Sequence, residues 1–528
     1  MKKLALVVCT LLLTTISFAK DYKITNVEYT LNPSSWKFLG TTKQFALENN
    51  VEVNKSKKFE TLEDLEAYIN DYKQRLDNTR AFDDYSVEYK INETSDLNEV
   101  TLYVTTTDTV HLLAVPYPKY DSNSGAVLKL KAKDSNFLGT MNTMSTDLNL
   151  SLDTTGDETK FALGFNFDYD YPFKAGIFNA TWVNSYSIDY TFGEDLPDWS
   201  GKTGLKFELP KTGISYILEL YQKVSYSGSY KSYGDQLYFT EYATFSMPIT
   251  LGEINYFGKV TTTPSISATY NWDMDGIDSN NTGLSSPFIT VGNTIGTSRI
   301  NWHNNFRTGL SANLATKVDY NLQRKTVNPY ITSEVRAFKG FTLFDNFNYF
   351  NRLGICSDIY GFYYFNDKKS LYASSDGQSI GSRLRGIKDS QGYSNIPASV
   401  NSTTVPASGN STTVPAAFVV NLDFPVHIFS TNFSKGFMRH FNFDLQVSPF
   451  VDFALTYNKA TEKLFDYKDG FYAAGVEVLV YPRKWSSFVV RGSIGVDIGR
   501  WLLSDFLNTE WREEVNKTEI SIGIGLHY

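Results

Sequence analysis

The amino-acid sequence predicts a mostly β protein, in which a transmembrane antiparallel β-barrel of about sixteen strands follows a small α+β domain. The main observation is the strict alternation of apolar with small or polar residues in 161–171 and in the C-terminal residues 520–528. Successive side chains of a strand point to opposite faces, so such segments turn one face to lipid and the other to an aqueous lumen. Beyond the N-terminus, no apolar run reaches the about 18 residues of a membrane-spanning helix. Strands are therefore the predicted membrane-crossing elements.

Residues 1–19 are predicted to be a secretory signal peptide. Lys2 and Lys3 precede an apolar stretch, and the segment Ser17-Phe18-Ala19 provides small residues for cleavage. Cleavage would leave Cys356 as the only cysteine. We therefore expect the exported chain to depend on its strand ladder and on burial, without an intrachain disulfide.

Residues 20–110 are predicted to form the α+β domain. Thr61 is placed to cap a helix whose apolar residues recur at helical spacing, namely Leu62, Leu65, Ile69, Tyr72 and Leu76. Strand candidates lie before and after this helix, at 22–31, 85–91 and 100–105. Because the helix is amphipathic, we expect its apolar stripe to pack on a small sheet.

Residues 111–528 are predicted to form the barrel. The segment 161–171 is longer than the about five or six residues of a typical soluble strand and suits the about 9–11 residues that cross a bilayer at a tilt. At roughly 25 residues per strand and connection, the region holds about sixteen strands. The segment Asn-Ser-Thr-Thr-Val-Pro-Ala occurs at 401–407 and at 410–416, which predicts a long extracellular loop around 370–416. The formal net charge of −8 gives no electrostatic basis for binding nucleic acid.

The parity of the last strand predicts which of its residues face lipid. The lipid-facing set is Ile520, Ile522, Ile524, Leu526 and Tyr528, and the lumenal set is Ser521, Gly523, Gly525 and His527. Glycine weakens strand packing, so Gly523 and Gly525 suit a seam that can open, although small lumenal residues are also ordinary in barrels.

The candidate site consists of Arg385 and Gly386 in a polar, glycine-rich loop, with Asp423 and Asp452 in two later strands. The apolar alternation in 420–426 and in 450–455 turns both aspartates toward the lumen. A guanidinium can bind carboxylate oxygens in pairs, and glycine permits a tight turn beside it. We therefore predict that the loop folds inward and that Arg385 pairs with both aspartates.

Arg383, in the same loop, is expected to be replaceable by alanine with almost no effect. The alternative for the whole site is that Arg385 is a solvated loop charge and that Asp423 and Asp452 merely line a watery pore.

These motifs resemble the BamA and TamA superfamily of outer-membrane assembly and translocation barrels, the bacterial surface antigen family. Leu384-Arg385-Gly386-Ile387 is similar to the Arg-Gly motif of the family's sixth outer loop, with Ile387 in place of an aromatic residue. Phe450-Val451-Asp452-Phe453-Ala454 is similar to its Phe-x-Asp-x-Gly strand motif, with Ala454 in place of glycine. Asp423 lies where the family often has an inward glutamate.

The resemblance extends to the start of the barrel and to the N-terminal domain. Residues 134–140 resemble the segment that leads into the family's first barrel strand. Phe59, the helix from Leu62 to Leu76, Phe82 and Val87 fall at the apolar positions of a polypeptide-transport-associated (POTRA) domain. The chain has room for about one such domain, whereas assembly barrels of the BamA branch usually have several.

The resemblance implies an outer-membrane barrel of a diderm bacterium with its POTRA-like domain in the periplasm. Such a protein inserts or translocates outer-membrane polypeptides through a lateral seam between the first strand, here after Thr140, and the last. Its implied partners are outer-membrane lipid, unfolded outer-membrane polypeptides and accessory periplasmic or lipoprotein subunits. Arg385, Gly386, Asp423 and Asp452 would then hold the sixth loop inside the lumen.

Other functions stay open at the level of sequence. A passive porin-like channel has the same fold, and a surface adhesin or antigen would use the Ser/Thr/Pro loop. Enzyme chemistry is not expected, because the five histidines are scattered and neither a His-Glu-x-x-His nor a Gly-x-Ser-x-Gly motif is present. A barrel phospholipase built from separated His, Ser and Asn residues is not excluded by motif. No cofactor or metal is expected, since the acidic cluster at 273–278 lacks the ligand series of an EF-hand.

Overall fold

The computed structural model describes residues 21–526 apart from 95–96, 122–124, 154–159, 227–236, 255–256, 274–286, 345–348, 366–377, 379, 381–382, 388–413, 436–440, 459–462, 486–487 and 509–517. The predicted signal peptide, most of the predicted extracellular loop, His527 and Tyr528 lie outside the described residues. The chain forms two compact units, one of Met1–Val110 with Leu138–Met141 and one of His111–Phe137 with Asn142–Tyr528. The short segment Leu138–Met141, which we expected in the barrel, thus belongs to the first unit, where the Gly139 carbonyl accepts a hydrogen bond from the Lys43 N–H at 2.8 Å.

The first unit is a four-stranded sheet with helices, in the order β2-β1-β4-β3. Its elements are β1 (Tyr22–Asn32), η1 (Lys37–Leu39), α2 (Gln44–Asn50), β2 (Lys58–Phe59), α3 (Leu62–Thr79), β3 (Phe82–Glu93) and β4 (Asn98–Asp108). β1 runs parallel to β4, whereas β2 and β3 pair antiparallel with β1 and β4 respectively. Among the described residues, no helix has the length and apolar character of a membrane span.

Helix α3 begins where the sequence predicts. The Thr61 side chain accepts a hydrogen bond from the Asp64 N–H at 3.1 Å, which satisfies one of the free donors of the first turn. The predicted core residues Leu65, Ile69 and Leu76 are buried, together with Tyr72. The prediction for Leu62 is wrong, because its side chain is 38% exposed. Helical side chains lean toward the N-terminus, so Leu62, in the first turn, extends past the packed part of the stripe.

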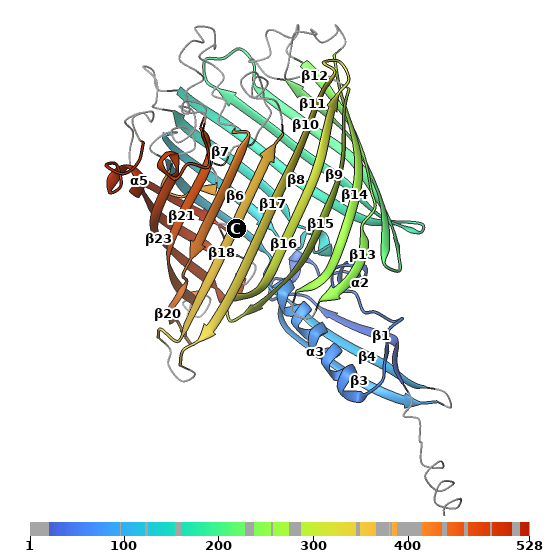
Figure 1. The fold of residues 1–528 in the computed structure, drawn as a ribbon. Coiled ribbons are helices and arrows are strands. Elements are labelled where there is room, and N and C mark those ends of the chain that lie inside the picture. The colour runs from blue at the N-terminus through green and yellow to red at the C-terminus, as the bar shows by residue number, and fades with distance from the viewer. Residues whose placement is uncertain are drawn as a thin grey trace, which may run out of the picture. The chain divides into compact units, whose positions relative to one another are not determined.

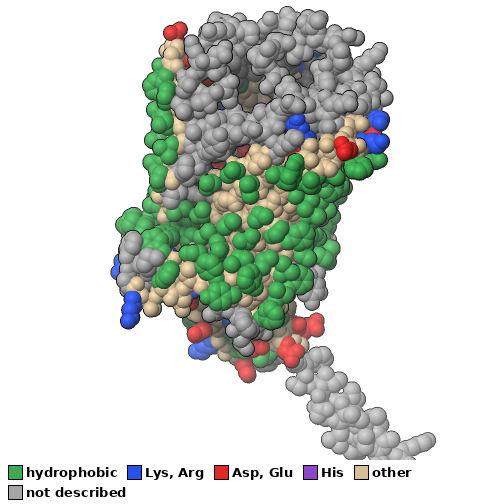
Figure 2. Space-filling view, turned by 90° about the vertical axis from the view of Figure 1, so that its left-hand side faces the viewer, with side chains coloured by type: hydrophobic (Ala, Val, Ile, Leu, Met, Phe, Trp, Pro, Cys, Tyr) green, Lys and Arg blue, Asp and Glu red, His purple; other side chains and the backbone are tan. Residues whose placement is uncertain are grey.

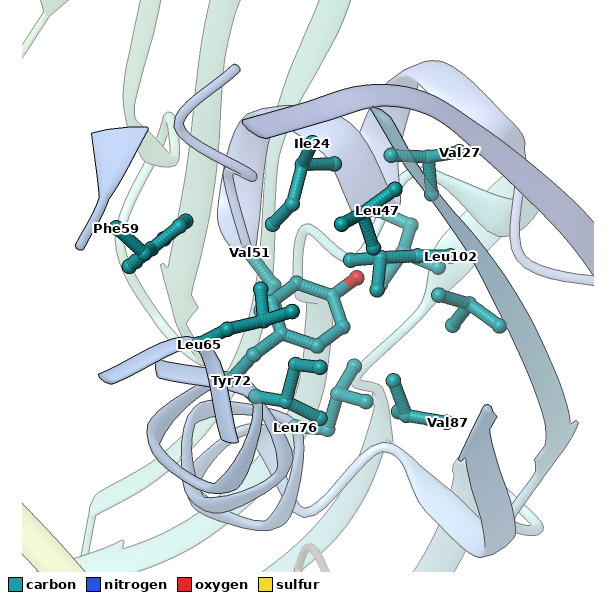
Figure 3. Packing of buried hydrophobic residues seen from close by; sticks show 13 residues of the cluster. Ile24, Val27, Leu47, Val51, Phe59, Leu65, Tyr72, Leu76, Val87 and Leu102 are labelled. Carbon is teal, nitrogen blue, oxygen red and sulfur yellow. The ribbon is translucent and has the colours of Figure 1, made fainter. Parts of the chain in front are cut away.

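The core of this unit lies between α3 and the sheet. Figure 3 shows the Tyr72 ring among Leu65 and Leu76 from the helix and Leu102 from β4. All four side chains are almost completely buried. The stripe predicted from spacing is therefore the contact surface of the helix with the sheet.

Adjacent residues of β4 should differ sharply in their contribution to stability. Leu102 is fully buried and Tyr103 is 38% exposed. We expect Leu102→Ala to lower the free energy of unfolding of this unit by about 2–5 kcal/mol, through lost burial and the cavity left behind. Tyr103→Ala should cost less than about 1 kcal/mol. Guanidinium titrations of the full chain, followed by a probe in the first unit, measure both, and similar midpoint shifts for the two variants would contradict the assignment.

The second unit is a closed antiparallel barrel (Figure 1). Its strands are β5 (Leu112–Asp121), β6 (Gly125–Asp134), β7 (Met144–Asp153), β8 (Lys160–Ala175), β9 (Phe178–Thr191), β10 (Asp198–Lys211), β11 (Ile214–Tyr226), β12 (Leu237–Ser246), β13 (Ile249–Ile254), β14 (Gly258–Trp272), β15 (Phe288–His303), β16 (Phe306–Asn321), β17 (Thr326–Thr342), β18 (Arg352–Tyr364), β19 (Ala416–Asp423), β20 (Val426–Ser430), β21 (Phe443–Asn458), β22 (Lys463–Leu464), β23 (Phe471–Pro482), β24 (Val490–Asp497) and β25 (Thr518–Ile524). The short helices along this part of the chain are η2 (Phe137–Gly139), η6 (Tyr467–Asp469), η7 (Arg483–Trp485) and α5 (Ile498–Trp501).

The described residues form 21 strand segments in the barrel, more than the about sixteen predicted. Part of the difference is interruption: β13 continues β12, and β20 continues β19, after breaks that contain Pro248 and Pro425. Proline cannot donate to the ladder and ends regular pairing. Connections are also shorter than assumed. Lys211 pairs with Ile214 across a two-residue turn in which Gly213 has φ 76°, a conformation that suits glycine.

The outer wall of the barrel is apolar, as the fold class requires. In β8, Phe161, Leu163 and Phe165 are 41–51% exposed, and they alternate with less exposed residues. Figure 2 shows a broad belt of hydrophobic side chains over the strands that face the viewer. A water-soluble protein does not present so large an apolar surface, whereas a membrane barrel requires it. The unit is a transmembrane β-barrel.

The first strand of the barrel is not the one we expected. Strands β5 and β6 precede Thr140 and belong to the wall, so the spatial order at the closure is β25-β5-β6-β7. The exposed Leu128 and Leu130 of β6 lie opposite the exposed Leu150 and Leu148 of β7. This hairpin therefore extends the lipid-facing surface, and β5 is the neighbour of the last strand.

The last strand follows the predicted parity at Ile520, Ser521 and Ile522, whereas the side chains of Gly523 and Ile524 lie outside the described residues. Ile520 and Ile522 are about half exposed on the lipid side, while Ser521 Oγ lies 2.7 Å from Ser493 Oγ of β24. The prediction for Leu526 is wrong, since this side chain is partly buried and packs with Leu479, Tyr481 and Val489. The regular strand ends at Ile524, and Gly525 has φ 102°, so the chain turns before Leu526 and the alternation no longer applies.

Candidate functional site

The described residues of the loop after β18 pack against the inner wall of the barrel. Its residues Ile380, Leu384, Ile387 and Val414 are buried with inward side chains of four strands, namely Phe362, Ala417, Val419, Ala454, Phe471 and Ala473. Small side chains on the wall leave room for the loop. Inward apolar residues of a barrel would otherwise face water, so their presence in β19, β21 and β23 is a sequence signal for a covering segment.

Arg385 is bound to Asp452 by three hydrogen bonds. Its backbone N–H and its Nε–H both donate to Oδ2 at 2.9 Å, and its Nη2 donates to Oδ1 at 2.6 Å. Asp452 is completely buried in β21. A paired, charge-assisted geometry of this kind fixes both the position and the orientation of the guanidinium.

The other edge of the guanidinium binds Asp423, at the end of β19. Nη1 donates to Oδ1 at 2.7 Å and Nη2 to Oδ2 at 3.2 Å. The Cζ atom of Arg385 lies 3.8 Å from the centre of the Phe450 ring, which suits a cation–π contact. The structure thus brings together all three charged residues that we singled out.

The charged cluster is larger than the sequence indicated. Glu477 of β23 is buried, with its Oε2 3.8 Å from Arg385 Nη1 and its Oε1 3.5 Å from Arg491 Nε of β24. Inward parity of Glu477 is visible in the alternation of β23, but its partners come from a loop and another strand, which no local pattern reveals. The cluster connects the loop to four consecutive wall strands, β19, β21, β23 and β24.

Gly386 brings the loop backbone against β24 and β25. Its N–H donates to Oε2 of Glu519, on the last strand, at 2.7 Å. A Cβ on Gly386 would lie 2.6 Å from the backbone N of Val496, and a Cβ on Gly495 would lie 2.8 Å from Gly386 Cα. With φ 84°, Gly386 also has a conformation that disfavours other residues. Glycine is therefore required on both sides of this contact.

Arg383, whose replacement we expected to have almost no effect, lies among charged and aromatic side chains. Its Nη1 lies 3.0 Å from Glu334 Oε1 and 3.6 Å from Asp358 Oδ2, and its guanidinium lies 3.5 Å from the centre of the Tyr360 ring. In addition, Asn421 donates to its carbonyl oxygen at 2.6 Å. These contacts argue against the prediction that its replacement is silent, because they place Arg383 on the lumenal side of β17 and β18.

Comparison with known proteins gives likenesses to solved structures only. No protein-family model and no curated protein sequence matches the chain. CdiB from Acinetobacter baumannii is 11% identical, with 95% of this chain and 74% of that chain covered and a TM-score of 0.47. For CdiB from Escherichia coli the identity is 10%, the coverage 96% and 76%, and the TM-score 0.46. BamA from Haemophilus ducreyi lacking POTRA domains 1–3 is 14% identical over 94% of this chain and 84% of that chain, with a TM-score of 0.34.

The architecture of this chain stands on its own contacts: a closed antiparallel barrel with an apolar outer belt, and an inner loop held by a buried arginine. By its fold, the chain consists of a small α+β unit followed in the sequence by a transmembrane β-barrel.

Proposed function

We propose that this protein is an outer-membrane barrel that inserts or translocates other outer-membrane polypeptides through a seam between its first and last strands. The observation that carries the proposal is that one inward loop binds both the wall and the closing strand. Arg385 binds Asp423 and Asp452, and the adjacent Gly386 binds Glu519 of β25. A loop that only narrows a pore could do so without a hydrogen bond to β25, the last strand of the barrel.

The proposed mechanism is lateral and involves no enzymatic step and no cofactor. A closed barrel hides its strand edges, and an opened seam exposes an edge to which an extended polypeptide can add. The seam lies between β25 and β5. The loop would keep strands β19 to β25 in place while the other side of the seam moves.

The resemblance to the BamA and TamA superfamily supports a periplasmic role for the first unit. Its succession of β1, α2, β2, α3, β3 and β4, with β1 parallel to β4, suits a POTRA-like domain. Among the described residues, β3 pairs only with β4 and is an edge of the sheet. A client polypeptide, or an accessory periplasmic or lipoprotein subunit, would add to that edge.

Reconstitution tests the proposal directly. The purified full chain is incorporated into liposomes, and a urea-unfolded eight-stranded outer-membrane barrel is added as client. We expect the folded fraction of the client to grow at least tenfold faster than in protein-free liposomes. Steady ion conductance without faster client folding would instead indicate a passive channel and overturn the proposal.

Glu519 provides a prediction that links the loop to the activity. Glu519→Ala removes the acceptor of the Gly386 N–H, and a charge-assisted bond of this kind contributes about 1.5–3 kcal/mol. We expect client folding to slow several-fold while the barrel still assembles. Glu253→Ala, which changes an exposed glutamate of β13, is the matched control. Equal rates for both variants would show that the loop contact with β25 plays no part in the activity.

A further inference from the structure

The two prolines of β5 lie on one side of the strand, and the register shows which side. The Ser135 N–H donates to the His111 carbonyl at 2.9 Å, and the pairing of β5 with β6 continues without a shift to Asp121 and Gly125. In an antiparallel pair, alternate residues exchange both hydrogen bonds, so the odd-numbered residues of β5 bond to β6. The even-numbered residues, including Pro116 and Pro118, direct their backbone away from β6.

That other side of β5 faces β25. The order β25-β5-β6 leaves no other neighbour for it. Proline has no N–H, so β5 cannot donate at positions 116 and 118, in the middle of its seam-facing edge. Proline is tolerated at the edge of a sheet because no neighbouring strand there needs a hydrogen bond from its backbone nitrogen. On the side that faces β25, β5 therefore offers fewer backbone hydrogen-bond donors than a strand without proline.

The edge of β25 that faces β5 lacks no backbone donor. The Gly525 N–H donates to the Val489 carbonyl at 2.8 Å, and the pairing of β24 with β25 is in the same register. Residues 519, 521 and 523 therefore bond to β24, whereas Thr518, Ile520, Ile522 and Ile524 direct their backbone to β5. None of these is proline, so every position of this edge can donate and accept.

β25 is attached to the barrel by contacts other than its pairing with β5. β25 is held by its ladder with β24, by the contact between Ser521 and Ser493, and by the bond from Gly386 to Glu519. The seam is therefore asymmetric: a complete, anchored edge on β25 meets an edge on β5 that lacks two donors.

We propose that the seam-facing edge of β25 is the surface that receives an extended client strand, and that the β5–β6 hairpin is its displaceable occupant in the closed barrel. The inference rests on the proposed function. The fitting partner is an extended polypeptide whose residues alternate between apolar side chains beside Ile520 and Ile522 and small or polar side chains beside Glu519 and Ser521. A client strand without proline gains donors that β5 cannot offer, which favours the exchange.

Site-specific photo-crosslinking identifies the edge that the client uses. A benzophenone amino acid is placed at Ile520 on β25 or at Ala114 on β5, both exposed and both on the seam-facing edge of their strand. With the urea-unfolded eight-stranded barrel as probe, we expect crosslinks from position 520 at least fivefold above those from position 114. Equal or stronger crosslinking from position 114, or crosslinks from position 520 to a second copy of this chain, would overturn the proposal.

Restoring the missing donors tests the role of the prolines. The variant Pro116→Val/Pro118→Val can form two more hydrogen bonds across the seam, and we expect it to slow client folding at least tenfold and to raise the temperature at which the folded barrel unfolds in detergent. Pro172→Val in β8, away from the seam, is the control. Unchanged client folding in the double variant refutes the asymmetric seam. If the wild-type protein neither accelerates client folding nor crosslinks at either position, the proposed function itself fails.

Discussion

Replacement of Arg385 by alanine is expected to lower the free energy of unfolding of the barrel by about 3–5 kcal/mol. The guanidinium donates four hydrogen bonds to two buried carboxylates, and its loss leaves Asp423 and Asp452 without their cation. Buried charges without a partner cost more than the pair contributed. The Phe450 ring also loses the cation stacked on it.

Guanidinium titrations in detergent micelles, followed by tryptophan fluorescence, measure this effect. Arg483→Ala is the matched control, because Arg483 binds Asp444 at 3.2 Å with 46% of its side chain exposed. An exposed pair contributes about 0–1 kcal/mol. Arg385→Lys should be intermediate, since an ammonium cannot bind both carboxylates in the paired geometry of arginine. If Arg385→Ala and Arg483→Ala shift the midpoint equally, Arg385 does not hold the loop.

Gly386→Ala is expected to lower the free energy of unfolding of the barrel by about 2–5 kcal/mol. The left-handed backbone contributes about 1–2 kcal/mol for a residue with a Cβ. Overpacking contributes about 1–3 kcal/mol more, because the new methyl group would lie 2.6 Å from the Val496 backbone N and 2.7 Å from the Gly495 carbonyl carbon. Backbone atoms of a strand cannot move aside as a flexible side chain can, so we expect the loop to lift off β24 and its bond to Glu519 to break.

Gly176→Ala separates the two contributions. Gly176 has φ 64° in the turn between β8 and β9, and a Cβ there would meet nothing within 4 Å. It should therefore lose only the about 1–2 kcal/mol of backbone strain. Limited proteolysis of the loop adds a second readout, in which Gly386→Ala becomes sensitive and Gly176→Ala does not. The same stability and the same protease resistance in both variants would mean that the loop is not packed tightly against β24.

The contact between Arg385 and the two aspartates could be predicted because it depends on parity and charge. Asp423 and Asp452 alternate with apolar residues, which sends them inward wherever the strands lie in the barrel. Glu477 and Glu519 obey the same parity. Their partners could not be predicted, because Arg491 and Gly386 reach them from other parts of the chain.

The predictions for Leu526, Leu62 and Arg383 disagree with the contacts in the structure for one reason: a pattern along the chain does not show where a strand ends or what packs against a side chain. Leu526 continues the alternation of the last strand in sequence, yet Gly525 ends the strand and turns the side chain inward. Leu62 continues the stripe of α3 beyond the part that meets the sheet. Arg383 lies in a polar loop, and only the inward fold of that loop gives it Glu334 and Tyr360 as neighbours.

The sequence by itself determined which face of each strand meets lipid and which meets water, and hence the fold class. Side chains of a strand alternate between two faces, and only apolar side chains are stable in lipid. The sequence also determined the capped amphipathic helix of the first unit and the charges that point into the barrel. The tertiary structure alone decided that β5 rather than the strand after Thr140 closes against β25, and that Gly386 binds Glu519 across 133 positions of sequence. Strand order and loop docking depend on contacts between residues distant in the chain, and no periodicity along the chain encodes them.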